Sequence, residues 1–329
     1  MEITAILWDI FYFAVFPGII FSFIVGQFYE GLDRKIAAHL QHRIGPPVWQ
    51  PFLDVGKLFT KEDITPANAQ SGLFNFSPYL GFGAIIAVML MIPVYAASAA
   101  FSASADLIVI IYLLNIPAVA IMLAGVSSST PFGAVGTERY IVQLFAFEFP
   151  FIIAALTVAV YVGDFSGGGW VLSLKNIVGA QQGLFGFAEN GWLLWKLPLA
   201  AVAMLLVAPA KLLKTPFDIP EAETEIVYGP LTEYSGPKLA LFKVMENIKL
   251  VAVAGFITAL FLGGPTTHIL FGYSIPAIVD FLLKTVSILI LITVIRSVTA
   301  RLRIHQAVKF YWTFVAILAI INLGYVMVF

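Results

Sequence analysis

The sequence contains no cysteine and few charged residues. Charged residues make up 11% of its 329 residues, whereas hydrophobic residues make up 60%. Without cysteine the chain forms no disulfide, thiolate metal site or cysteine-held iron–sulfur cluster of its own. Soluble domains carry about 25% charged residues, so this composition excludes an ordinary soluble fold, and the abundance of apolar residues excludes disorder. The four histidines show no spacing typical of a metal site.

Long apolar runs dominate the sequence. A helix that crosses a bilayer needs about 20 mostly apolar residues. Eight segments meet this requirement: 5–28, 79–99, 106–126, 141–163, 192–213, 240–262, 277–296 and 307–328. The first carries acids where a signal peptide would carry Lys or Arg, so we expect it to stay as an anchor. The sequence therefore predicts an all-α membrane protein of about eight transmembrane helices, with residues 1–329 forming a single integral membrane domain.

Basic residues are distributed unevenly between the predicted loops. Most lie in four loops at about 30–78, 127–140, 211–239 and 297–306, whereas the loops on the other side carry essentially Lys175. Cytoplasmic loops of membrane proteins are enriched in Lys and Arg. We therefore expect these four loops to face the cytoplasm, and eight spans then place both termini outside the cell membrane.

The first of these loops predicts two short amphipathic helices separated by residues 45–47. Leu32, Ile36 and Leu40 recur at every fourth position in the first helix, and apolar residues within 48–59 form one stripe in the second. Helices of this kind lie in the membrane interface with their basic residues near lipid headgroups. Such a pair can also form a wall on which a soluble partner docks.

The loop at 211–239 is rich in acidic residues. It contains the stretch KLLKTPFDIPEAETEIVYGPLTEYSG, with Asp218, Glu221, Glu223, Glu225 and Glu233. On a helix, Glu221 and Glu225 share a face and Glu223 points elsewhere. A solvated acidic loop with ordinary capping explains the composition equally well. Acids crowded beside membrane spans, however, repel one another and lose solvation, and both effects raise carboxyl pKa values.

Ionisable residues inside membrane spans are expensive and usually functional. Glu148 lies in the apolar stretch FAFEFP, with no basic residue near it in the sequence. Glu246 has Lys243 and Lys249 one turn away on either side, which predicts a chain of charges on one helix face. Of these residues, Glu148 is the hardest to explain as a structural feature.

Three ordered motifs resemble a known family. They are GLDRKIAAHLQHRIGPPVWQPFLDVGKLFTKEDITP, GTERYIVQLFAFEFP and TPFDIPEAETEIVYGPLTEYSG. Together they resemble the H subunit of bacterial respiratory complex I. They also resemble the membrane subunit of group 4 membrane-bound nickel–iron hydrogenases, formate hydrogenlyase and the archaeal membrane-bound sulfane reductase. The resemblance covers nearly the whole chain.

Details of the motifs favour one branch of this family. The stretch from Gly45 to Pro51 is compact, as in the hydrogenase-type members, whereas quinone-reducing complex I enzymes have a longer, glycine-containing stretch there. We therefore expect a hydrogenase or sulfane-reductase relative. The alternative is the quinone-binding H subunit of an NADH-linked or reduced-deazaflavin-linked quinone oxidoreductase, since Asp218 is shared with quinone-linked members. Lys214 and Thr215 stand where many relatives have an arginine, so no arginine-specific role carries over.

The resemblance implies a non-catalytic subunit that couples electron transfer to translocation of H⁺ or Na⁺. A peripheral arm, with a hydrogenase-like large subunit and an iron–sulfur small subunit, would dock on the cytoplasmic loops, and antiporter-like membrane subunits would adjoin. Iron–sulfur clusters, with a nickel–iron centre in a hydrogenase, would lie in the partners, and quinone would be bound only in the alternative. No cofactor or metal is expected in this subunit, and no nucleic acid.

The resemblance also implies roles for individual residues. The proton or coupling path would include Glu148, Asp218, Glu221, Glu223, Glu225, Glu233 and Glu246. A charged corner would be formed by Glu138, Arg139 and Lys214, and docking would use Arg43, Lys57 and Lys61.

A stand-alone secondary transporter and a passive membrane anchor are competing interpretations. Acids within spans fit a transporter, but the sequence shows no inverted repeat and its large polar loops lie on one side only. A passive anchor leaves the acidic loop and Glu148 unexplained.

Overall fold

Helices make up most of the chain. The computed structural model describes residues 11–165, 169–181, 191–270 and 273–328. The longer helices are α2 (Ile19–Leu40), α3 (Gln50–Phe59), α4 (Ser71–Met91), α5 (Asp106–Leu113), α6 (Ile116–Ser127), α7 (Pro131–Phe165), α10 (Pro198–Lys211), α12 (Gly236–Phe261), α13 (Ala277–Val298) and α15 (Ala316–Val328). Shorter helical elements are α8 (Leu174–Gly179), α9 (Leu193–Lys196), η2 (Ile219–Glu221), α11 (Glu223–Ile226), η3 (Gly229–Leu231), α14 (Ile304–Lys309) and the π-helical turn η4 (Phe310–Val315). Two short strands, β1 (His268–Leu270) and β2 (Tyr273–Ile275), pair antiparallel before α13.

The predicted all-α membrane protein is confirmed. Among the described residues, seven helices are long and apolar enough to cross a membrane. The predicted span at 192–213 is the exception, because it divides into α9 and the 14-residue α10 at Leu197. Leu197 precedes a proline, and the proline ring disfavours helical backbone at the residue before it. Residues 5–10 of the first predicted span lie outside the described residues.

The first predicted amphipathic loop helix is not a separate element, and that prediction is wrong. α2 continues without a break from Ile19 to Leu40, so the stripe at 32, 36 and 40 extends the first membrane helix. The second amphipathic helix is confirmed as α3, which packs against α2 and α12. Gly31 permits the close approach of the chain before α3, because an added Cβ would lie 1.9 Å from the carbonyl oxygen of Val48.

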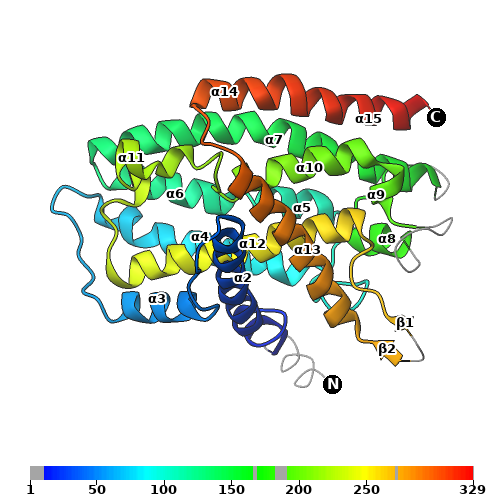
Figure 1. Cartoon of the computed structure of the whole chain (residues 1–329), viewed down its shortest axis with the longest axis horizontal. Helices are drawn as coiled ribbons and strands as arrows, with labels where there is room; N and C mark the ends of the chain where they lie inside the picture. The colour runs from blue at the N-terminus through cyan, green and yellow to red at the C-terminus, as the bar shows by residue number, and fades with distance from the viewer. Residues whose placement is uncertain (1–10, 166–168, 182–190, 271–272, 329) are drawn as a thin grey trace.

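α12 lies at the centre of the bundle, and α2 and α13 cross it at a steep angle (Figure 1). It contacts α2, α4, α10 and α13, and its residues from Asn247 to Phe261 are all buried. A helix shielded from lipid in this way can carry polar side chains where neighbouring helices satisfy them. Asn247 of α12, for example, donates a hydrogen bond to Gln27 of α2 at 2.8 Å.

The loops gather at the two ends of the bundle (Figure 1). α3, α11 and the start of α14 lie at one end, and α8, α9 and the β1–β2 hairpin lie at the other. Hydrogen bonds join the loops of the first end: Leu302 N to Pro216 O at 3.1 Å, and Gln70 N to Ser127 O at 2.9 Å. The four basic loops, predicted to share one side of the membrane, therefore lie at the same end.

Candidate functional site

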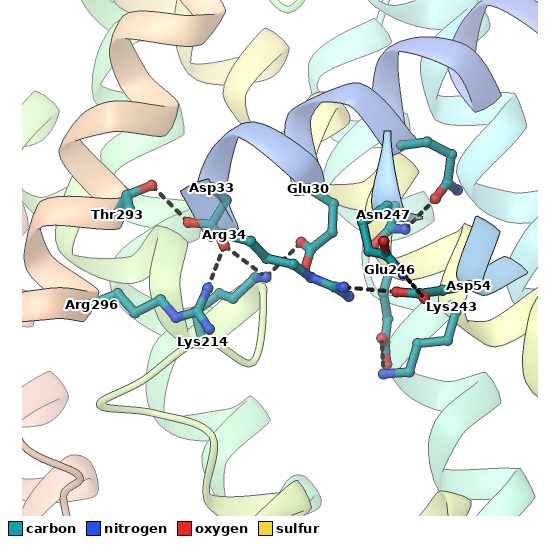
Figure 2. A network of polar contacts seen from close by, with 12 residues as sticks. Glu30, Asp33, Arg34, Asp54, Lys214, Lys243, Glu246, Asn247, Thr293 and Arg296 are labelled. Atoms are coloured by element: carbon teal, nitrogen blue, oxygen red, sulfur yellow. Dashed lines mark hydrogen bonds and ion pairs between the residues drawn. The ribbon is translucent and has the colours of Figure 1, made fainter. Parts of the chain in front are cut away.

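A buried ion network joins α2, α13 and the segment that follows α10 (Figure 2). Lys214 Nζ lies 2.8 Å from Glu30 Oε2 and 3.1 Å from Asp33 Oδ2. Asp33 is only 1% exposed, and it also accepts hydrogen bonds from Thr293 Oγ1 at 2.7 Å and from the Arg296 guanidinium. Burial opposes the charged form of Lys214, but the attraction of the two carboxylates outweighs it and raises the pKa of Lys214. This network fixes the segment after α10 against the two tilted helices.

Arg34 extends the network to α3. Its guanidinium lies 2.9 Å from Glu30 Oε1 and 2.9 Å from Asp54 Oδ2, and Asp54 Oδ1 accepts a hydrogen bond from Gln50 Nε2 at 2.9 Å. Burial would raise the pKa of Asp54, but these hydrogen bonds and nearby cations hold it below its ordinary value. The amphipathic helix is therefore held to the membrane bundle by charged side chains as well as by backbone packing.

Two carboxyl groups face each other beside this network. The turn η2 brings Glu221 against Glu246 of α12, and Lys243 Nζ lies 2.9 Å from Glu246 Oε2. Burial and the neighbouring Glu246 carboxylate raise the pKa of Glu221 from 4.5 to about 8. The Lys243 ammonium also lies 4.8 Å from the centre of the Tyr228 ring. Glu221 therefore exchanges its proton near neutral pH.

Four buried oxygens around this pair have no hydrogen-bond partner among the described residues. They are Oε1 of Glu221, Oε1 of Glu246 and the hydroxyl oxygens of Tyr140 and Tyr228. Both tyrosines interact electrostatically with both carboxylates. Buried polar groups normally have partners, and a proton on one carboxyl group supplies a donor to such a cluster. The surroundings of the pair therefore favour the protonated form.

A cavity of about 370 Å³ connects the ion network with the carboxyl pair. Charged and polar side chains of α2, α12, α13 and the acidic loop line it. On one wall, Arg301 Nε lies 2.9 Å from Asp218 Oδ1, and Arg301 also donates to Thr224 Oγ1 at 3.0 Å. The hydrogen bond with Asp218 raises the pKa of Arg301. These bonds attach the acidic loop to the segment between α13 and α14.

A second ion pair lies deeper in the bundle. Glu148 Oε2 is 2.9 Å from Lys211 Nζ, and Glu148 Oε1 accepts a hydrogen bond from Asn115 Nδ2 at 2.7 Å. Lys211 also donates to Asn115 Oδ1 at 2.9 Å, and its ammonium lies 3.9 Å from the centre of the Phe151 ring. Lys211 is 1% exposed. Glu148, which has no basic residue near it in the sequence, therefore has one in space, because α10 supplies Lys211.

Comparison with known proteins identifies the family. The family model described as NADH dehydrogenase matches residues 13–327. The chain belongs to this family.

Curated relatives and a solved structure agree with this assignment. The NADH-quinone oxidoreductase subunits H of Bacillus thuringiensis (strain Al Hakam) and Bacillus cereus (strain AH187) are each 32% identical over 298 residues, which cover 88% of this chain and 85% of theirs. A chain in the structure of the membrane-bound sulfane sulfur reductase, an archaeal respiratory membrane complex, is 30% identical, with a TM-score of 0.82 and 99% of both chains covered. The predicted resemblance is confirmed, and the chain is an H-type membrane subunit of a complex-I-like assembly.

Within this family fold, the predicted coupling residues fall into separate groups. Glu221 and Glu246 form the carboxyl pair, Asp218 and Glu223 line the cavity, and Glu148 lies in the deeper ion pair. Glu225 is exposed and forms an ion pair with Arg139, and Glu233 lies half-buried in the acidic loop without lining the cavity.

The prediction that Glu221 and Glu225 share a helix face is wrong. Ala222 has extended backbone and separates η2 from α11, so the two glutamates lie on different short elements. The buried side chains of Ile219, Ala222 and Ile226 anchor both short elements to the bundle.

The three residues of the predicted charged corner do not form one group. Lys214 joins the ion network of Glu30 and Asp33, Arg139 pairs with Glu225, and Glu138 is exposed. The predicted docking residues, Arg43, Lys57 and Lys61, are all exposed, and they lie in α3 or in the segments beside it.

Several residues of the site are absent from the sequence prediction. Glu30, Asp33 and Arg34 fall where the sequence predicts a surface helix, in which charges are expected to meet solvent or headgroups. Arg296 and Arg301 are counted only as signals of orientation. Two acids and an arginine on one helix, in a chain with 11% charged residues, are the signal that could have found the first three. No group of three or more histidine, aspartate or glutamate side chains that could hold a metal occurs in the part of the chain that the structure describes.

Proposed function

We propose that this subunit docks a peripheral redox arm and couples electron transfer there to translocation of H⁺ or Na⁺, in an assembly of the hydrogenase or sulfane-reductase type. Its partners are a hydrogenase-like large subunit, an iron–sulfur small subunit and antiporter-like membrane subunits. Iron–sulfur clusters, and a nickel–iron centre in a hydrogenase, belong to the partners. The observation that carries this proposal is the charged cavity at one end of the bundle, next to a carboxyl pair and a deeper ion pair.

The cavity supplies a place where redox events can change protonation. Reduction of a cofactor in a docked partner adds negative charge near the cavity, and added negative charge raises carboxyl pKa values. Since the pKa of Glu221 is about 8, its carboxyl group holds a proton at neutral pH while the cofactor is reduced, and loss of the added negative charge on reoxidation lowers that pKa towards release of the proton. The new charge on Glu221 and Glu246 then acts through the interior on the pair of Glu148 and Lys211, because charges separated by a low-dielectric interior are screened weakly.

The end of the bundle that holds the cavity is the proposed docking face. Arg43, Lys57 and Lys61 are exposed there, and Trp49 and Leu53 of the adjacent segment and α3 are 65% and 52% exposed. We place this end in the cytoplasm, as the distribution of Lys and Arg favours, with both termini of a single membrane domain on the opposite side.

The quinone-binding alternative is supported by the names of the Bacillus relatives, which are subunits of NADH-quinone oxidoreductases. The lining of the cavity favours the main proposal, because ionic side chains from five segments suit protons and small ions better than an isoprenoid tail. The identity of the co-purifying large subunit decides between the two. Two CxxC pairs indicate a hydrogenase, altered cysteines indicate sulfur reduction, and their absence indicates quinone.

The test of coupling uses Glu148→Gln and Glu221→Gln in the assembled complex, reconstituted in sealed vesicles. Each change keeps the shape of the side chain and removes its titratable group. Because the redox chemistry occurs in a partner, reduction of an artificial dye should stay within twofold of wild type, while ions taken up per electron should fall at least fivefold. The exposed Glu62→Gln is the matched control and should change neither quantity. Full ion uptake per electron in both variants would refute the proposed path.

A further inference from the structure

Lys249 occupies an unusual position in the middle of α12. It is the fourteenth residue of a 26-residue helix and is only 3% exposed. No hydrogen bond or ion pair to any residue that the structure describes holds its ammonium group, although every other buried lysine of the bundle has such a partner within the described parts of the chain. An ammonium ion that is buried at mid-membrane without a partner is costly, whereas a neutral amine or a transiently hydrated ammonium is not.

The charges around Lys249 are unequally divided between two groups. On its deeper side, the single carboxylate of Glu148 faces two lysines, Lys211 and Lys249. On its other side, the two carboxyl groups of Glu221 and Glu246 face the single ammonium of Lys243. When both carboxyl groups of the pair are ionised, the first group therefore has a cation in excess and the second an anion in excess. Moving one proton from the first group to the second removes both excesses.

Lys249 is placed to make that transfer. It lies three residues after Glu246 on the same buried helix, and residues at this spacing are neighbours on a helix surface. It interacts electrostatically with Glu221 and Glu246, and also with Lys211 and Glu148. A lysine side chain has a flexible stem and three rotatable donors, so one ammonium group can turn between two acceptors.

We propose that Lys249 carries the proton between the carboxyl pair Glu221–Glu246 and the ion pair Glu148–Lys211. This inference rests on the proposed coupling function and assigns a residue to its central step. In that step, an N–H bond of the Lys249 ammonium breaks and an O–H bond forms on the carboxylate of Glu246 or Glu221. The nitrogen keeps the electron pair, and the products are a neutral amine and a carboxylic acid. No oxidant, reductant or cofactor is consumed.

The transfer also changes the deeper ion pair. While Lys249 is charged, it repels Lys211 and competes with it for Glu148. When Lys249 is neutral, Glu148 and Lys211 form a balanced pair. Protonation at the cavity and the strength of the Glu148–Lys211 pair are thereby linked through one amine.

The experiment compares Lys249→Met, Lys249→Arg and the exposed Lys309→Met in the assembled complex in sealed vesicles, with Glu148→Gln measured alongside. Methionine keeps the length of the side chain without charge. Arginine keeps the charge but does not release a proton at neutral pH. We expect ions taken up per electron to fall at least fivefold in both Lys249 variants and to be unchanged in Lys309→Met, while dye reduction stays within twofold of wild type in all of them.

The outcomes separate the two levels of the proposal. If Lys249→Arg pumps as wild type while Lys249→Met does not, the residue supplies only a fixed charge and the proton transfer is refuted. If both Lys249 variants pump fully while Glu148→Gln fails, the inference is refuted and the coupling function stands. Should the larger arginine prevent assembly, infrared difference spectra decide the question. Reduction of the wild-type complex should produce the band of a protonated carboxyl group, and Lys249→Met should lack it; an unchanged band would overturn the inference.

Discussion

Glu221→Gln should stabilise the folded subunit at alkaline pH. The pKa of Glu221 is raised from 4.5 to about 8 by burial and by the Glu246 carboxylate. An acid with a raised pKa binds its proton more tightly in the folded state than in the unfolded state. Folding is therefore penalised as the pH rises above 4.5, where the unfolded chain ionises, and the penalty is complete above about 8. Glutamine has the same shape and does not ionise, so it escapes this penalty.

The size of the effect follows from the pKa change. One pKa unit corresponds to about 1.4 kcal/mol, so the full penalty is about 5 kcal/mol. Glu221 is half-buried beside a solvent-accessible cavity, and Lys243 lies next to its carboxylate partner, so screening reduces the penalty to about 2–3 kcal/mol at pH 8. At about 2 °C per kcal/mol, the melting temperature should rise by about 4–6 °C.

The assay is thermal unfolding of the purified subunit or complex in detergent, followed by intrinsic fluorescence between pH 5 and pH 8.5. The stabilisation should be small at pH 5 and largest at pH 8 or above. Glu223→Gln, an exposed acid two residues away, is the matched control and should shift the melting temperature by less than about 1 °C at every pH. The reasoning fails if Glu221→Gln shifts the melting temperature equally at all pH values, or if it destabilises the protein at pH 8.

Other positions provide independent tests. Lys214→Met leaves two buried carboxylates short of a partner and should lower the free energy of unfolding by about 3 kcal/mol, measured by denaturant titration in detergent. Gly31→Ala brings a Cβ within 1.9 Å of the Val48 carbonyl oxygen and should cost about 1–3 kcal/mol, with faster proteolysis around α3. Since the chain has no cysteine, single cysteines introduced at Lys61 and Lys175 should be labelled only from the cytoplasm and only from outside, respectively; labelling of both from one side would contradict the proposed orientation.

The membrane fold could be predicted from the sequence because apolar length and the positions of prolines are local signals. The same signals define α12, whose polar residues recur within an otherwise apolar stretch. The extension of α2 to Leu40 could not be predicted from periodicity alone, since an amphipathic stripe suits both a surface helix and the end of a membrane helix. The close approach of the segment before α3 to Gly31, together with the ion network, favours the continuous membrane helix over a separate surface helix.

The sequence shows the acidic residues of the site, and the local pair of Lys243 and Glu246, but not the partners that come from distant elements. The acids of the loop at 211–239 are evident in the sequence, whereas their partners come from distant elements. Lys211 reaches Glu148 from another helix, and Lys214 reaches acids on α2. The backbone is a second reason why the site could not be predicted. A continuous helix would place Glu221 and Glu225 on one face, but the extended backbone of Ala222 puts them on two separate short elements. Tertiary contacts of this kind leave no periodic trace in a sequence.

The central location of α12 has a consequence for how the protein is made. A lysine or aspartate at the centre of a helix opposes insertion by about 2.5–3.5 kcal/mol, and α12 carries Lys243, Glu246 and Lys249 within two turns. The leucine, isoleucine, valine and phenylalanine residues of the helix each favour insertion by only about 0.3–0.6 kcal/mol. This helix therefore enters the bilayer poorly by itself and needs α2 and α4, which are synthesised earlier, to receive its polar face. Insertion of α12 is therefore cooperative. The helices that are already in the membrane provide the polar partners for its charged side chains, which lipid does not provide.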